Sequence, residues 1–271
     1  MRNKKRFSLR LHFLDPSRAP DKVKIVHSIV ENILRYSWNG LQRIDLAHCP
    51  GIHDNDILNI LVKCRRVGSV TLSFCVSERA LMYTAVYATC LVELDVSGCC
   101  SATTTFVQAF LERHSSSLQK LILSDCMGLR RGNDFDEMVD MLGKSDNLRV
   151  LDISWTKKSY TACPFNECHV MCIIQSCKSL RALNLSGTVV ISMTKHCQNL
   201  TSLSLGRTCL EDGDLLQITK YCKKLQYLDL SSCALLTLPG FESLVSLERL
   251  GRLILNNCVQ LKGDSLSCIL N

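Results

Sequence analysis

A nine-residue phrase recurs along most of this chain, and its recurrence constrains the fold more than any other feature. Each copy has hydrophobic residues at its first, fourth and sixth positions and closes with Cys or Thr at the ninth. The copies are LQRIDLAHC from Leu41, VGSVTLSFC from Val67, LVELDVSGC from Leu91, LQKLILSDC from Leu118, LRVLDISWT from Leu148, LRALNLSGT from Leu180, LTSLSLGRT from Leu200, LQYLDLSSC from Leu225 and LGRLILNNC from Leu250. Nine copies in register predict a repeat architecture.

The centre of each phrase alternates hydrophobic and variable residues, which is the period of a β-strand. A stretch with helical spacing follows each phrase. After Cys49 we expect one helix face formed by Ile57, Leu58, Leu61 and Cys64, with Asp54 or Asp56 as its cap. After Thr208 we expect Leu215, Leu216, Ile218 and Cys222 to point inward. Each repeat is therefore predicted to be a short strand, a turn and a short helix.

A single strand–helix layer cannot bury its own hydrophobic face, so the layers must stack. The predicted fold class is an α/β leucine-rich-repeat solenoid, a right-handed arc with parallel strands on its concave face and helices on its convex face. We expect residues 41–271 to form this domain, with nine repeats of which the last is truncated at LKGDSLSCILN. Residues 1–40 are expected to be a degraded first repeat or an N-terminal extension, with a strand at residues 9–13 and a helix at residues 21–34.

The 17 cysteines follow the same pattern. Six close a phrase, and four more stand three residues before the next phrase: Cys49, Cys75, Cys99, Cys126, Cys233 and Cys258, then Cys64, Cys177, Cys197 and Cys222. A reduced cysteine behaves as a small buried hydrophobic residue, so we expect packing rather than disulfides. Free thiols in this number favour a reducing compartment, the cytoplasm or the nucleus.

Composition excludes several classes of protein. The chain has 271 residues, of which 46% are hydrophobic, and a formal charge of +7 that is spread along the sequence. No hydrophobic run approaches the roughly 18 to 20 residues of a membrane span. The basic start of the chain has too short a hydrophobic run for a signal peptide. We expect no membrane and no nucleic-acid partner, because there is no basic stripe with interleaved aromatic residues.

The nine phrases, together with helix segments such as IHDNDILNILVKC and LEDGDLLQITKYC, resemble the cysteine-containing subclass of leucine-rich repeats. Its members include the F-box proteins with leucine-rich repeats and the F-box-less antagonist-of-mitotic-exit-network family. The resemblance covers residues 41 to 271. It implies a protein–protein interaction module that recognises substrates for a Skp–cullin–F-box ubiquitin ligase, and so a role in ubiquitin-mediated protein degradation.

No F-box is recognisable in residues 1–40, and the Skp-type adaptor and the cullin bind through that module in the family. Two alternatives stay open. The chain is either the recognition part of a longer F-box protein or a free-standing scaffold or regulator that never joins a ligase.

Partner contacts in such a fold are expected on the strand face and on the loops at the strand ends. The residue before the closing Cys or Thr has little reason to be buried, and aromatic and Arg residues dominate binding hot spots. We therefore predict partner contacts at Phe74, Trp155 and Arg207, and at Tyr227 on an outward strand position. Isolated surface aromatics are also common without any function. A column of aspartates at Asp45, Asp95, Asp152 and Asp229 is interpreted as a recurring feature of the phrase rather than as a binding site.

The two longest repeats carry extra residues in MGLRRGNDFDEM from Met127 and KKSYTACPFNECHVMC from Lys157. Each insertion has a basic pair, Arg130–Arg131 and Lys157–Lys158. We hypothesise that these pairs, edged by aromatic residues, form a basic patch for an acidic or phosphorylated segment. The alternative is a pair of solvated loops.

Cys163, Cys168, His169 and Cys172 form the one cluster that suggests a metal, but their spacing is not that of a structural zinc site. We predict no metal and no cofactor. The sequence has no glycine-rich phosphate loop, GxSxG elbow or HExxH helix, so we do not expect an enzyme.

Overall fold

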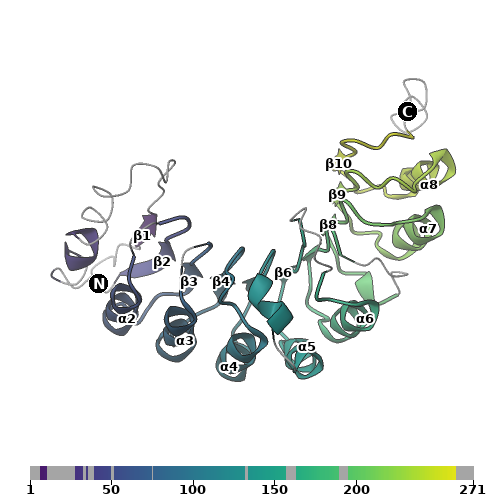
Figure 1. Ribbon diagram of the computed structural model, residues 1–271. Coiled ribbons are helices and arrows are strands. Elements are labelled where there is room, and N and C mark those ends of the chain that lie inside the picture. The colour runs from purple at the N-terminus through teal and green to yellow at the C-terminus, as the bar shows by residue number, and fades with distance from the viewer. Residues whose placement is uncertain are drawn as a thin grey trace, which may run out of the picture. The chain divides into compact units, whose positions relative to one another are not determined.

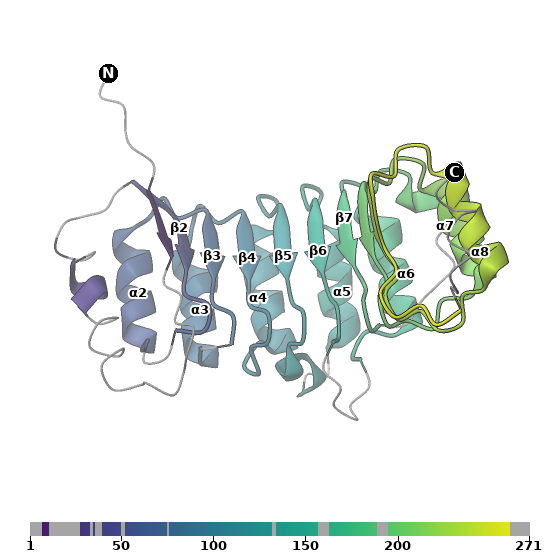
Figure 2. The ribbon, with the colours of Figure 1, turned by 90° about the horizontal axis from the view of Figure 1, so that it is seen from above.

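A computed structural model describes residues 7–10, 28–32, 35, 40–49, 52–74, 76–131, 134–156, 163–188 and 195–260. The chain divides into two compact units, residues 1–147 and residues 148–271, which we call unit 1 and unit 2. Each is a stack of strand–helix layers, with parallel strands on one face and helices on the other (Figures 1 and 2).

The strands of unit 1 are β1 (Phe7–Arg10), β2 (Leu41–Asp45), β3 (Ser69–Thr71), β4 (Glu93–Asp95) and β5 (Lys120–Ile122). Its helices are α2 (Asp54–Lys63), α3 (Glu78–Tyr87), α4 (Thr104–His114), the 3-10 helix η1 (Met127–Arg131) and α5 (Phe135–Gly143). Neighbouring strands are parallel and pair in chain order from β1 to β5. β1 begins two residues before the predicted strand, and residues 11–13 lie outside the described part of the chain.

The strands of unit 2 are β6 (Val150–Asp152), β7 (Ala182–Asn184), β8 (Ser202–Ser204), β9 (Tyr227–Asp229) and β10 (Arg252–Ile254). They too are parallel and pair in chain order. The helices are α6 (Glu167–Ser176), α7 (Asp212–Tyr221), α8 (Leu238–Glu242) and the 3-10 helices η2 (Lys195–Cys197) and η3 (Ser243–Ser246). The shortest spacing, the 20 residues from Leu180 to Leu200, leaves the layer with the 3-10 turn η2 as its described helix.

The hydrophobic positions of the phrase form the core. Leu91, Leu94 and Val96 are at most 1% exposed, and the same positions in the other copies are buried with few exceptions. The phrases stack in register, since Leu94 pairs with Val70 on one side and with Leu121 on the other. Equivalent side chains therefore lie on top of one another, and each layer covers the hydrophobic face of the next.

One expected helix face is wrong in detail, and of the two aspartates expected to cap α2 it is Asp56 that does so. Leu216 was predicted to point inward, but its side chain is 55% exposed, and Thr219 is buried on the inner face instead. Helix α2 begins after His53, whose backbone N–H donates to Asp56 Oδ2 at 3.0 Å, so the acidic residue acts from the third helical position.

The closing cysteines have a polar function as well as a packing one. Cys99 Sγ donates to the carbonyl of Leu72 at 3.0 Å, and Cys126 Sγ donates to the carbonyl of Val96 at 3.1 Å. Each of these bonds joins one layer to the layer before it. All fifteen cysteines that the structure describes are free thiols.

Candidate functional site

Outward-pointing side chains cover the strand face of unit 1, because alternate residues of a strand point to opposite sides. From β1 to β5 these residues are Ser8 and Arg10, Arg43 and Asp45, Ser69 and Thr71, Glu93 and Asp95, and Lys120 and Ile122. Most of these side chains are positively charged, negatively charged or hydroxyl-bearing. The surface is therefore suited to polar recognition rather than to burial of a large hydrophobic area.

The aspartate column supports the turn after each strand. Asp95 Oδ1 accepts hydrogen bonds from the backbone N–H of Ser97 and from Ser73 Oγ, both at 2.9 Å. Asp229 accepts in the same way from the N–H and the hydroxyl of Ser231. A carboxylate two residues before an N–H forms a local turn of this kind. The aspartates thus recur because they support the turn, which agrees with their interpretation as a feature of the phrase.

The position before the closing residue is a column of left-handed backbone. It has positive φ in eight of the nine phrases, at His48, Phe74, Gly98, Asp125, Gly187, Arg207, Ser232 and Asn257. Gly, Asn and Asp tolerate this conformation, whereas a bulky residue is unfavourable there by roughly 1–2 kcal/mol. The column explains the small and polar residues found at most of these positions.

Among the residues of that column, Phe74 is the bulkiest one in the unfavourable left-handed conformation. Its φ is 66° and its side chain is 49% exposed. The ring stacks on His48, with centroids 4.4 Å apart and an interplanar angle of 14°. It also lies over Gly98, where an added Cβ would collide with the ring. An exposed aromatic side chain held in an unfavourable backbone conformation is the kind of feature that marks a functional position.

Trp155 does not match its prediction. We expected its side chain to be free for a partner, but it is 6% exposed. Trp155 is the one residue of the column without the left-handed conformation, so the rule that places this residue outside the core does not hold in its phrase. Its indole belongs to the packed interior of unit 2.

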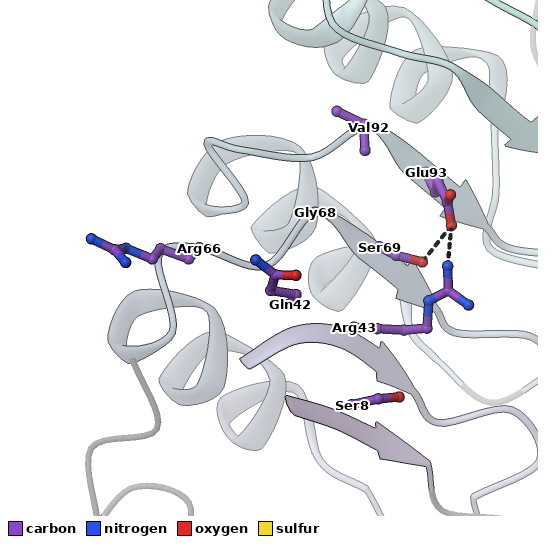
Figure 3. Close-up of a pocket in the computed structure, with 8 residues that line it drawn as sticks. All are labelled: Ser8, Gln42, Arg43, Arg66, Gly68, Ser69, Val92 and Glu93. Atoms are coloured by element: carbon purple, nitrogen blue, oxygen red, sulfur yellow. Dashed lines mark hydrogen bonds and ion pairs between the residues drawn. The ribbon is translucent and has the colours of Figure 1, made fainter. Parts of the chain in front are cut away.

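Two adjoining hollows lie on the strand face of unit 1. The first has a volume of about 520 Å³ and is lined by Ser8, Gln42, Arg43, Arg66, Gly68, Ser69, Val92 and Glu93 (Figure 3). The second, of about 380 Å³, is lined by Arg10, Arg43, Asp45, Ala47, His48, Ser69, Thr71, Ser73, Phe74, Glu93, Asp95, Ser97 and Lys120. The lining residues Arg43, Ser69 and Glu93 are common to both. We call the two hollows together the β3 valley.

The valley exists because one phrase has small residues where its neighbours have large ones. The phrase from Val67 supplies Gly68, Ser69, Thr71 and Ser73, whereas the same positions in the flanking phrases include Gln42, Arg43, Val92 and Glu93. An added Cβ on Gly68 would meet its nearest atom at 3.5 Å, which is ordinary contact. Glycine is thus not required by the backbone there, and its effect is to leave the space open.

An ion pair crosses the middle of the valley. Arg43 Nη2 lies 3.0 Å from Glu93 Oε2, and the same oxygen accepts a hydrogen bond from Ser69 Oγ at 2.8 Å, as the dashed lines in Figure 3 show. A second pair, Arg10 with Asp45 at 3.2 Å, lies beside it. Both arginine side chains are at least half exposed, so these pairs contribute little stability and are open to exchange with a ligand.

In unit 2 the two predicted contact residues are already partly engaged. The exposed side chain of Arg207 donates from Nη1 to the carbonyl of Thr156 at 3.1 Å. The ring of Tyr227 is half-buried and lies under the Arg252 guanidinium, with 5.6 Å between Cζ and the ring centroid. Partner contacts at both residues stay predictions.

The predicted basic patch is only half described. Arg130 and Arg131 are exposed at the end of η1 in unit 1. Lys157 and Lys158 lie outside the described residues. The basic patch therefore stays a hypothesis.

Within the cluster that suggested a metal, His169 has another role, in the N-terminal cap of α6. His169 Nδ1 accepts from the backbone N–H of Asn166 at 3.2 Å, and Asn166 Oδ1 accepts from the N–H of His169 at 2.9 Å. This reciprocal pair is a capping box. Among the residues that the structure describes, no group of three or more potential metal ligands is gathered.

Sequence reasoning missed the role of Arg66, Gly68 and Ser69. A signal was present: written under one another, the phrases show that the one from Val67 has smaller outward residues than the phrases on either side of it. Arg66 is less visible, because it lies in the loop before β3, outside the phrase. None of the helices in the described ranges is long and hydrophobic enough to cross a membrane.

Comparison with known families finds leucine-rich repeats in two stretches. Residues 87–210 match the model of Zer-1-like leucine-rich repeats, and residues 221–245 match a general leucine-rich-repeat model. No curated protein sequence matches this chain significantly.

Several solved structures share the fold. The leucine-rich-repeat protein LegL7 from Legionella pneumophila is 16% identical, with a TM-score of 0.56, over 98% of this chain and 96% of that one. Rad7, from the complex of Rad7 and Elc1 in yeast, is 14% identical, with a TM-score of 0.52, over 94% of this chain and 80% of that one. TLR13, from its complex with ssRNA13, is 19% identical, with a TM-score of 0.51, over 80% of this chain but only 29% of its own. At these identities the likeness extends to the fold alone, and this chain has the α/β leucine-rich-repeat fold that its nine phrases predict.

Proposed function

We propose that the chain is a protein-recognition module and that its strand face in unit 1 binds the partner. The observation that carries this proposal is the β3 valley, an open polar depression with the exposed ring of Phe74 at one end. Binding sites combine a concave surface with a few well-placed polar and aromatic groups, and the valley has both. The yeast Rad7 structure, a fold neighbour solved in complex with Elc1, is a precedent for a protein partner on this fold.

We further propose that the recognised protein is a substrate for ubiquitin ligation. The support is the resemblance of the nine phrases to the repeats of F-box proteins. A Skp-type adaptor and a cullin would then be assembly partners, provided that an F-box is supplied by another segment or another protein. The second candidate is a free-standing scaffold or regulator, which the F-box-less relatives favour. The cytoplasm or the nucleus is the proposed location, because reduced thiols survive there.

The test is affinity capture of the full chain from cell extract, followed by mass spectrometry. The control is F74N, because asparagine tolerates the left-handed conformation and removes only the ring. Partners that are captured by the natural chain and lost with F74N would support recognition through the valley. Co-purification of the Skp-type adaptor and a cullin would support the ligase role, and partners without either would favour the scaffold. Capture that F74N and the natural chain share completely would contradict the proposed surface.

A further inference from the structure

We propose that the β3 valley binds an extended peptide segment that has a carboxylate at one end and an aromatic side chain about six residues away. This inference rests on the proposed function and specifies the ligand of the same surface. Its basis is the run of small residues along the phrase from Val67, together with the cationic side chains and exposed rings that line the same two hollows.

The valley runs along the phrase from Val67 rather than forming an isolated pit. Its floor passes from Gly68 and Ser69 through Thr71 and Ser73 to Phe74. At about 3.3 Å per residue, the six steps from Gly68 to Phe74 span at most roughly 20 Å, because the backbone turns after β3. An extended peptide of about seven residues matches that length. A folded domain would instead contact the higher rims on both sides.

The hydrogen-bonding groups of the valley show a surplus of donors. Its three carboxylates are already engaged: Asp45 with Arg10, Glu93 with Arg43 and Ser69, and Asp95 with Ser73 and Ser97. Two cations are not. The side chains of Arg66 and Lys120 have no hydrogen-bond or ion-pair partner among the described residues. The ligand that complements this surface must bring acceptors with negative charge, and carboxylates are the natural choice.

The two cations lie in different hollows, since Arg66 lines the first and Lys120 lines the second, while Arg43 lines both. Arg66 extends from the loop before β3, at the end away from Glu93 (Figure 3), and Gln42 and Ser8 add polar groups to the same hollow. We assign the ligand carboxylate to this end. Arg43 lies between, and its exposed pair with Glu93 lets it turn toward a ligand carboxylate without leaving a buried charge unpaired.

The opposite end of the valley suits an aromatic side chain. The rings of Phe74 and His48 stack there, and both residues are exposed. A ligand ring can extend this stack, and stacked or edge-to-face aromatic pairs are favourable beyond the area they bury. The left-handed backbone of both residues, with φ of 66° at Phe74 and 55° at His48, fixes the rings before the ligand arrives.

The experiment is selection of a displayed random nonapeptide library on the purified full chain. G68Q fills the valley floor with the residue that another phrase has at the same position, and the free space around Gly68 tolerates it. G251Q is the matched control, since Gly251 has the same position in the last phrase and its added Cβ would meet its nearest atom at 3.8 Å. R66E tests the sign of the charge. Correct folding of each variant is checked by circular dichroism and thermal unfolding.

The natural chain and G251Q should enrich peptides with an Asp or Glu and an aromatic residue about six positions apart. G68Q should lose that enrichment, and R66E should replace the acidic residue by Lys or Arg. For a fluorescent peptide with two aspartates, a spacer of roughly four residues and one Phe, we expect binding at least about fivefold tighter than for its lysine counterpart at low salt, with the difference falling at high salt.

Three results would overturn the inference. Enriched peptides without a charge preference would contradict the carboxylate, and equal enrichment by the natural chain and G68Q would contradict the valley. Tighter binding of a single-stranded RNA oligonucleotide that competes with the peptide would assign the site to another class of ligand. In each case, capture by the natural chain still shows separately whether the chain recognises proteins, and its comparison with F74N shows whether it does so through the valley, so the two failures are distinguishable.

Discussion

The two units are built from the same phrase, yet they close it differently. In unit 1 the closing residues are cysteines, and the thiols of Cys99 and Cys126 each donate to a carbonyl of the preceding layer. In unit 2 the first three closing residues are threonines, and the hydroxyls of Thr188 and Thr208 donate to carbonyls only three residues earlier, at 2.6 Å. A cysteine here joins its layer to the preceding one, whereas a threonine donates within the turn of its own layer, although Thr208 Oγ1 also lies 3.6 Å from Cys233 Sγ of the following layer.

The strand faces of the units differ as well. At the first outward position of β2 to β5 unit 1 has Arg43, Ser69, Glu93 and Lys120, whereas β6 to β9 of unit 2 have Val150, Ala182, Ser202 and Tyr227. The buried positions are nearly interchangeable between the units, and the outward ones are not. The difference shows that the scaffold depends on the phrase, while recognition depends on the residues that the phrase leaves unspecified.

The largest effect on stability should come from replacing the aromatic residue that precedes the closing residue of one phrase in each unit. W155A removes a buried indole and should lower the free energy of unfolding by about 3–5 kcal/mol. F74N removes an exposed ring from a left-handed position and should leave stability unchanged or raise it by up to about 1 kcal/mol. Urea unfolding followed by circular dichroism measures both. A large loss with F74N would mean that Phe74 belongs to the core, and the comparison between the units would fail.

Closing residues provide the second test. C126A removes a fully buried thiol and its bond to the preceding layer, and it should cost about 2 kcal/mol. Burial raises the pKa of the Cys126 thiol, so it stays protonated and acts as a donor. T208A should cost about 1 kcal/mol, because Cys233 Sγ also donates to the Leu205 carbonyl, at 3.2 Å, and continues to do so. Equal costs in urea unfolding would remove the distinction between fastening across layers and within them.

A buried histidine should make unit 1 sensitive to acid. His114 is 4% exposed, its Nε2 lies 3.0 Å from the Ala85 carbonyl, and its ring stacks on Phe110. Burial lowers the pKa of His114 below its ordinary value of 6.5. The unfolded chain therefore takes up a proton first as the pH falls, and stability should decrease through pH 6.5 until the folded pKa is passed.

The variant H114Q should remove this part of the pH dependence, because glutamine can donate to the Ala85 carbonyl and does not titrate. H196Q in unit 2 is the matched control, since His196 is partly exposed. Thermal unfolding between pH 7.5 and pH 4.5 measures the slopes. Identical slopes for H114Q and the natural chain would place the acid sensitivity in other residues.

The sequence predicts the layers well and the site poorly, for one physical reason. Burial at the hydrophobic phrase positions repeats with the phrase, so a residue such as Leu94 can be assigned from its register alone. Leu216 and Trp155 break the expectation because local geometry, a helix face in one case and the missing left-handed turn in the other, determines their exposure. The valley depends on a difference in side-chain size between neighbouring phrases, which a search for similarity hides.

The smallest expected effect concerns the basic pair on η1. The side chains of Arg130 and Arg131 are exposed, so the double variant R130E/R131E should change the free energy of unfolding by less than about 0.5 kcal/mol. If the β3 valley is the site, capture of valley-dependent partners should be unchanged as well, since neither arginine lines it. The basic-patch hypothesis predicts the opposite, namely loss of acidic or phosphorylated partners with full stability. The comparison of this variant with G68Q in one capture experiment therefore assigns each partner to the patch or to the valley. A partner lost with both would contact two surfaces.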